Sequence, residues 1–103
     1  MHTATNGEIA SEFGTALQWY RVARHWTQTD FANAVRAMYK NAKICANKVN
    51  HIENRKAIAS IKEIVMLCNA LEITLDDLLA KAKEYAQRRK ELECFPDDAE
   101  ELQ

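Results

Sequence analysis

The stretch CANKVNHIENRK, residues 45–56, places amide, imidazole and cationic side chains around two large aliphatic residues. Val49 and Ile52 are three residues apart, so a short helix would carry both on one side and its polar residues on the other. Amides and cations are the groups that read base edges and hold phosphates in nucleic-acid complexes. The same pattern also fits a helix whose polar face simply meets water, and the segment alone leaves both interpretations open.

The sequence shows no set of residues whose types and spacing would suit catalysis. The sequence contains no nucleophile paired with a base, no glycine-rich phosphate loop and no cluster with metal-ligand spacing. The three cysteines, Cys45, Cys68 and Cys94, form no C-x-x-C pair, and no run of apolar residues is long enough to span a membrane. We therefore expect a cytoplasmic protein with reduced thiols, no enzyme activity, no metal and no cofactor.

Five helices are expected to position the polar segment. The chain has only two glycines and one proline, and strand-like alternation of β-branched residues is absent, which predicts an all-α fold. Thr27, Ser60 and Thr74 are the residue types that cap helix N-termini. Apolar periodicity and these caps place the helices at about residues 8–24, 28–39, 42–54, 59–71 and 75–94.

The length of 103 residues suits a single domain. Its parts are expected to be an N-terminal arm at 1–7, a helical domain at 8–80, a C-terminal helix extension at 81–95 and an acidic tail at 96–103.

Positive charge is concentrated in the middle of the chain. The formal net charge is −1, but residues 21–56 contain eight Lys or Arg against Asp30 and Glu53. Phosphate contacts depend on local cations rather than on total charge. The total therefore does not exclude a DNA-binding protein.

Four sequence landmarks occur in a characteristic order. They are F-G-x-x-L from Phe13 with Arg21 further on; W-T-Q-T-D-F-A from Trp26; I-E-N from Ile52; and S-I-K-E-I-V-M-L-C-N-A-L-E-I-T-L-D-D-L-L from Ser60. In this order they resemble the Xre/Cro/CI group of lambda-repressor-like helix-turn-helix DNA-binding domains, and the resemblance extends from Phe13 to Leu79.

The resemblance implies a five-helix lambda-repressor-like domain whose recognition helix, residues 46–53, enters the major groove. It also implies a buried ion pair between Arg21 and Glu53. The residues implied to read bases are Ala46, Asn47, Lys48, Asn50 and His51, and those implied to hold phosphates are Gln28, Lys43, Asn54, Arg55 and Lys56.

The chain departs from the family pattern at three helix ends. Between Val35 and Ile44 the family usually has a one-residue glycine turn, whereas this chain has R-A-M-Y-K-N-A-K. Either the preceding helix continues for two more turns, or the insert forms a small element of its own. Arg55 and Glu72 replace glycines that usually end helices, so a left-handed cap there is expected to be strained or absent.

A stripe of Leu78, Ala82, Tyr85 and Leu92, interrupted by Arg89, follows one face of the last expected helix. The stripe suits the seam of a homodimer, because helix-turn-helix domains usually bind two half-sites as dimers. It also suits a helix that folds back on its own domain.

Together these features predict a sequence-specific transcription regulator, a repressor that binds double-stranded DNA as a homodimer. The alternative from another class is a protein-interaction module, such as an antitoxin or antirepressor-like adaptor, that uses the C-terminal helix on a protein partner.

Overall fold

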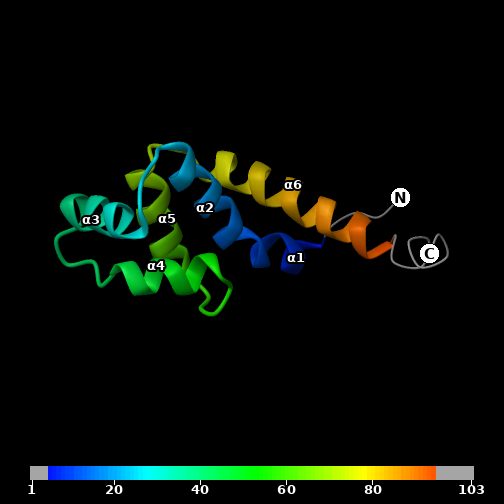
Figure 1. Cartoon of the computed structure of the whole chain (residues 1–103), viewed down its shortest axis with the longest axis horizontal. Coiled ribbons are helices and arrows are strands. Elements are labelled where there is room, and N and C mark those ends of the chain that lie inside the picture. Colours follow the sequence, from blue (N-terminus) through cyan, green and yellow to red (C-terminus); the bar gives the residue numbers. More distant parts are fainter. Residues whose placement is uncertain (1–4, 95–103) are drawn as a thin grey trace.

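The computed structural model describes residues 5–94, which contain six helices and no strand (Figure 1). The all-α prediction is therefore confirmed. The acidic tail at 96–103 and most of the predicted N-terminal arm lie outside the described residues, as do the side chains of Asn6 and of residues 90–94. The helices are α1 (Asn6–Ser11), α2 (Phe13–Ala23), α3 (Gln28–Met38), α4 (Ala46–Glu53), α5 (Ile61–Ala70) and α6 (Leu75–Cys94).

The first predicted helix is broken into α1 and α2, so the expected number of five helices was wrong. Glu12 ends α1 and precedes α2, with φ −99° and ψ 4°. Its side chain is buried, and its backbone carbonyl accepts a hydrogen bond from the Ala16 N–H at 2.9 Å. The apolar spacing of Ile9, Phe13 and Leu17 continues across the break, which is why periodicity did not reveal it.

Side-chain caps begin α3, α5 and α6 at the predicted residues, whereas α2 and α4 have no side-chain cap hydrogen bond. Thr27 and Ser60 each form a reciprocal capping box with the acidic residue three positions later, and Thr5 does the same for α1. The Thr74 hydroxyl accepts the Asp77 backbone N–H at 3.0 Å. Each cap satisfies backbone N–H groups that the first helical turn leaves without a partner.

One apolar core joins the helices, with α5 packed against α3 and α6. The α6 helix lies along α1 and α2, while α4 packs against α2 and α3 (Figure 1). In the described part of the chain, no helix has the length and apolar character needed to cross a membrane. The largest side chains that are almost completely buried include Leu17, Phe31, Ile44, Val49, Leu67, Leu71 and Leu78.

The insert between Val35 and Ile44 takes neither of the predicted forms. The α3 helix ends at Met38, one residue before the predicted end at 39, and the chain then passes through a turn at Lys40 and Asn41 and continues without further helix to Cys45. The buried side chain of Ile44 anchors this loop, and its carbonyl accepts Arg36 Nη1 at 3.3 Å. Because Cys45 is an extended N-cap, α4 begins at residue 46 instead of 42.

Three helices end in left-handed residues that are not glycine. His25, Arg55 and Glu72 have φ of 61°, 61° and 59°. After each of them the chain forms the backbone hydrogen bond of a Schellman motif, such as Lys56 N–H to the His51 carbonyl at 2.8 Å. The left-handed caps at Arg55 and Glu72 are therefore present, and their Cβ atoms make this conformation unfavourable compared with glycine.

Candidate nucleic-acid interface

The α4 helix has one buried side and one polar side. Val49 is 2% exposed and Ile52 4% exposed, as the i, i+3 pattern predicted. At about 3.6 residues per turn, Asn47, His51 and Asn54 lie on the opposite side of the helix axis. The polar side is therefore turned away from the core.

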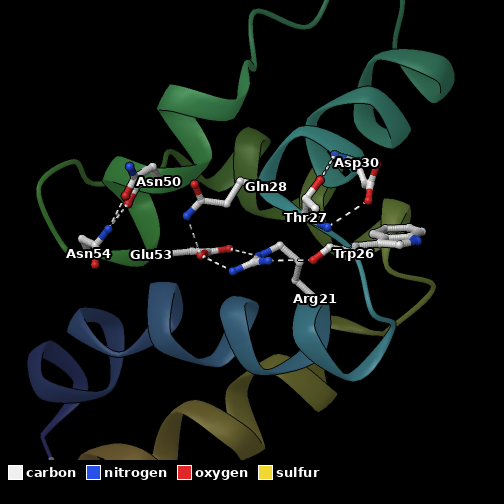
Figure 2. A network of polar contacts seen from close by, with 8 residues as sticks. All are labelled: Arg21, Trp26, Thr27, Gln28, Asp30, Asn50, Glu53 and Asn54. Carbon is white, nitrogen blue, oxygen red and sulfur yellow. Dashed lines mark hydrogen bonds and ion pairs between the residues drawn. The ribbon is translucent and has the colours of Figure 1, made fainter.

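A buried ion pair sets the orientation of α4 (Figure 2). Arg21 in α2 donates through Nε to Glu53 Oε2 at 2.7 Å and through Nη2 to Glu53 Oε1 at 3.0 Å. Its third nitrogen, Nη1, donates to the Trp26 carbonyl at 2.7 Å. The ion pair implied by the family resemblance is present. Because a bidentate guanidinium–carboxylate contact has a fixed geometry, it restricts the rotation of α4.

The side chain of Gln28 takes part in the same network. Its Nε2 donates to Glu53 Oε1 at 3.1 Å, and Figure 2 shows the amide turned toward Glu53. This geometry uses the amide nitrogen inside the protein, whereas the resemblance implied that Gln28 holds a phosphate. The contact links the first turn of α3 to the last turn of α4.

Gly14 lets α2 approach the end of α4 unusually closely. A Cβ atom at this position would lie 1.9 Å from the Ile52 carbonyl oxygen and 2.8 Å from its carbon. Backbone atoms cannot move aside as a flexible side chain can. Glycine is therefore required here for the observed depth of α4 against the domain.

A second buried carboxylate, Glu12, was missed by the sequence analysis. Its Oε2 lies 2.9 Å from Arg55 Nη1 and 3.1 Å from Arg89 Nε, while its side chain is only 1% exposed. Glu12 thereby ties the second residue after α4 to α6. The available signal was that Arg89 interrupts an apolar stripe, as a cation with a buried partner would.

Half of the cations in residues 21–56 are paired with carboxylates. Besides Arg21 and Arg55, Arg24 lies 2.8 Å from Glu72, and Lys48 lies 3.7 Å from Glu63. The sequence count therefore overstates the charge that is free to meet phosphates. The remaining four are Arg36, which bonds Asn33 and Ile44, and the exposed lysines Lys40, Lys43 and Lys56.

The five residues implied to read bases are not equivalent. Asn47 is exposed, and Asn50 and His51 are partly exposed on the polar side. Ala46 and Lys48 lie toward the flanks of the helix, and the Lys48 ion pair draws its ammonium toward α5. The outer face of α4 is therefore formed mainly by two amides and an imidazole.

Asn54 is bonded to Asn50 one turn earlier. Its Nδ2 donates to the Asn50 backbone carbonyl at 2.9 Å and also contacts Asn50 Oδ1 (Figure 2). This interaction holds the Asn50 side chain and leaves its Nδ2 donors to face outward. Lys43 precedes α4 and Lys56 follows it, and both side chains are exposed.

The two described cysteines differ in their surroundings. Cys45 is exposed at the N-cap of α4, where the backbone N–H groups of Lys48 and Asn47 lower the pKa of its thiol. Burial raises the pKa of Cys68 to about 11. Within residues 5–94, no group of three or more His, Cys, Asp or Glu is arranged to hold a metal ion.

The predicted dimerisation stripe is largely used inside the chain. Leu78 and Ala82 are both 0% exposed, because α6 packs against α1 and α2. These two residues are therefore not available to a second copy, which agrees with the alternative of a helix folding back on its own domain. Tyr85 is partly exposed, and the side chain of Leu92 lies outside the described residues.

Comparison with protein-family models, curated proteins and solved structures gave no match. The all-helical fold and the polar side of α4 are thus the features from which a function can be argued.

Proposed function

We propose that this chain is a sequence-specific DNA-binding transcription regulator, a repressor that inserts α4 into the major groove as a homodimer. The single observation that supports this most is the division of α4 into two sides. Val49, Ile52 and Glu53 anchor it in the core, while Asn47, Asn50 and His51 are turned away from it. A helix that only met water would not require amides on this face.

The chemistry of the outer face suits base edges. An asparagine amide can donate to N7 of adenine and accept from the N6 amino group of the same base. A histidine N–H can donate to N7 or O6 of guanine. The Asn47 side chain has no competing contact in the described structure, and the contact of Asn54 Nδ2 with Asn50 Oδ1 holds the Asn50 amide in one orientation. Preorganised amides lose less freedom when they bind.

Exposed cations stand at both ends of α4. Lys43 precedes the helix by three residues and Lys56 follows its last residue by three. Eight helical residues span about 12 Å, which is close to the ~12 Å width of the major groove. The two lysines flank a helix of a length that fits the major groove, so they are candidates for contacts with phosphates at its edges, and Lys40 adds charge in the preceding loop.

The test is selection of bound sequences from a random duplex pool, followed by anisotropy titrations at several salt concentrations. Asn47→Ala is expected to reduce the preference for the selected duplex over a scrambled one. Lys43→Ala is expected to weaken binding to both and to make the slope of log K against log salt shallower by about 1. Lys83→Ala, on an exposed part of α6, is the matched control and should leave both unchanged. If neither the selected nor the scrambled duplex binds the protein at low salt, the proposal is refuted.

A protein-interaction module is the second candidate, and one surface favours it. A hollow of about 420 Å³ between α2 and α6 is lined in part by Trp19, Val22 and Tyr85. Trp19 is 44% exposed and Val22 54% exposed, and exposed Trp and Tyr often dominate binding energy at protein interfaces. If Trp19→Ala abolishes self-association in sedimentation experiments, the hollow serves the homodimer. If the chain stays monomeric and ignores DNA, the interaction module becomes the better proposal.

A further inference from the structure

An apolar groove lies between α1 and the segment that joins α4 to α5. Its volume of about 390 Å³ falls toward the lower end of the ~300–1,000 Å³ common for binding sites. Ile58 lines the groove and is 96% exposed, and the nearby Ile61 is 82% exposed. Large aliphatic side chains this open to water, grouped beside an apolar groove, mark a contact surface. The lining includes Ala10, Phe13, Ile52, Ala57, Ile58 and Ile64.

The rim of the groove is positively charged. Among the described residues that line it, only Arg55 bears a charge, and Lys56 and Lys62 are exposed on the same segment and the first turn of α5. Of the nearby carboxylates, Glu12 is buried and shared by two arginines, Glu63 is paired with Lys48, and Glu8 of α1 accepts the Thr5 backbone N–H. An occupant with apolar anchors and negative charges would match this surface.

We propose that the groove binds the chain's own C-terminal segment, residues 95–103, whose sequence is F-P-D-D-A-E-E-L-Q. Phe95 and Leu102 supply apolar anchors near its two ends, and four carboxylates lie between them. The segment holds four of the chain's 15 Asp and Glu and none of its 14 Lys and Arg. The other 94 residues therefore carry a surplus of cations, part of which forms the rim of the groove.

The segment starts close enough to reach the groove. Arg89 of α6 bonds Glu12, whose second partner is the groove residue Arg55. The helix continues for five residues to Cys94, or about 7.5 Å at 1.5 Å per residue. Nine further residues can span up to about 30 Å when extended. Pro96 disfavours continuation of the helix, so the chain is expected to leave its direction there.

Docking would have a consequence for the proposed function. Arg55 and Lys56 are among the residues assigned to phosphates, so a docked acidic segment and a DNA backbone would compete for the same cations. The docking itself rests on the groove and its charges and does not depend on DNA binding.

Paramagnetic relaxation enhancement in the full chain tests the docking directly. A nitroxide is attached to Gln103→Cys in a chain that also carries Cys45→Ser and Cys94→Ser. Cys68 can remain, because it is 3% exposed. The label then reports where the end of the segment lies without altering either apolar anchor.

The amide signals of Ala10 and Ile58 at the groove are expected to lose most of their intensity. Those of Asn33 and Ala37 in α3, which lies away from α1 (Figure 1), should keep theirs. Equal losses in α1 and α3, or no loss in either, would overturn the proposal.

Two controls make the result specific. The first control replaces the four carboxylates of the C-terminal segment with amides of the same size. This change should restore the amide signals of the groove and raise the affinity of the chain for duplex DNA several-fold. The second mixes labelled, isotope-free protein with unlabelled, isotope-enriched protein; broadening there would show that a second copy occupies the groove and would overturn the intramolecular assignment. Groove broadening in a chain that ignores every duplex would support the docking while refuting the proposed function. The neutralising substitutions are Asp97→Asn, Asp98→Asn, Glu100→Gln and Glu101→Gln.

Discussion

The backbone of Gly14 lies directly against the carbonyl group of Ile52. A Cβ atom at residue 14 would come within 1.9 Å of that oxygen. Gly14 is in the first turn of α2, and Ile52 is in the last turn of α4. The contact therefore determines how far α4, and with it the amide-rich face, projects from the domain.

Gly14→Ala is expected to lower the free energy of unfolding by about 3 kcal/mol, at the upper end of typical overpacking costs. The methyl group can be accommodated only if the two helix backbones move apart. Urea unfolding followed by circular dichroism measures the change.

Gly7→Ala is the matched control for this substitution. Outside the adjacent residues and the backbone of its own helix, the nearest heavy atom to a Cβ at residue 7 would be Thr5 Oγ1, at 4.0 Å. Alanine favours a helix over glycine by up to about 1 kcal/mol. Gly7→Ala should therefore leave stability unchanged or raise it slightly. An equal loss in both variants would contradict the close-approach explanation.

Arg21→Met is expected to cost about 3–5 kcal/mol, because it leaves the Glu53 carboxylate without its ion-pair partner in a buried site. The Glu53 side chain is 1% exposed and the Arg21 side chain 11% exposed. Chemical denaturation of the single variants and of Arg21→Met/Glu53→Met measures the coupling.

The double variant should be more stable than either single variant, since no unpaired buried charge remains. Additive losses would show that the two side chains act independently. The exposed pair of Arg24 and Glu72 provides a comparison, and Arg24→Met should cost only about 0–1 kcal/mol.

The sequence predicted those features that depend on neighbouring residues. Thr27, Ser60 and Thr74 cap their helices, because a side-chain oxygen needs only the backbone N–H of the next turn. Val49 and Ile52 are buried because their spacing defines one helix side. Leu78 and Ala82 would form the same apolar stripe whether α6 packed against a second chain or against its own domain. Periodicity alone therefore could not identify the packing partner.

Apart from the Arg21–Glu53 ion pair, which the family resemblance implied, features that depend on distant residues escaped prediction. The break at Glu12 requires cations from residues 43 and 77 positions further along the chain. The start of α4 at residue 46 instead of 42 depends on where Ile44 can enter the core, which the sequence of the insert alone does not specify. The charge count of residues 21–56 likewise ignored carboxylates supplied by α5 and by the residues around Glu12 and Glu72.

His25→Gly is expected to stabilise the protein by about 0.5–1 kcal/mol, which should raise the melting temperature by a few degrees. His25 has φ 61° and an exposed side chain. Glycine removes the unfavourable contact of Cβ in the left-handed region, and greater freedom in the unfolded chain offsets part of this gain.

His25→Ala serves as the control, because it removes the imidazole but keeps the Cβ. It should leave the melting temperature near that of the unaltered chain. A similar rise in both variants would assign the effect to the imidazole and not to the left-handed cap.

Cys45 is expected to react with iodoacetamide far faster than Cys68. The thiolate is the nucleophile, and the N–H groups of Lys48 and Asn47 lower the pKa of exposed Cys45, whereas burial raises that of Cys68 to about 11. Since a lowered pKa means that the thiolate forms at lower pH, the alkylation rate of Cys45 should reach half its maximum below the ordinary thiol pKa of about 8.5. Peptide mapping by mass spectrometry in a Cys94→Ser chain separates the two sites.

Unfolding the chain in denaturant should abolish the difference, because both thiols then titrate normally. A folded-state midpoint for Cys45 at or above the unfolded one would contradict the role of the helix N–H groups. The same assay bears on the proposed function, because Cys45 is the N-cap of the helix proposed to enter the major groove of DNA. A selected duplex should therefore slow the alkylation of Cys45. A scrambled duplex of equal length should slow it only at higher concentration.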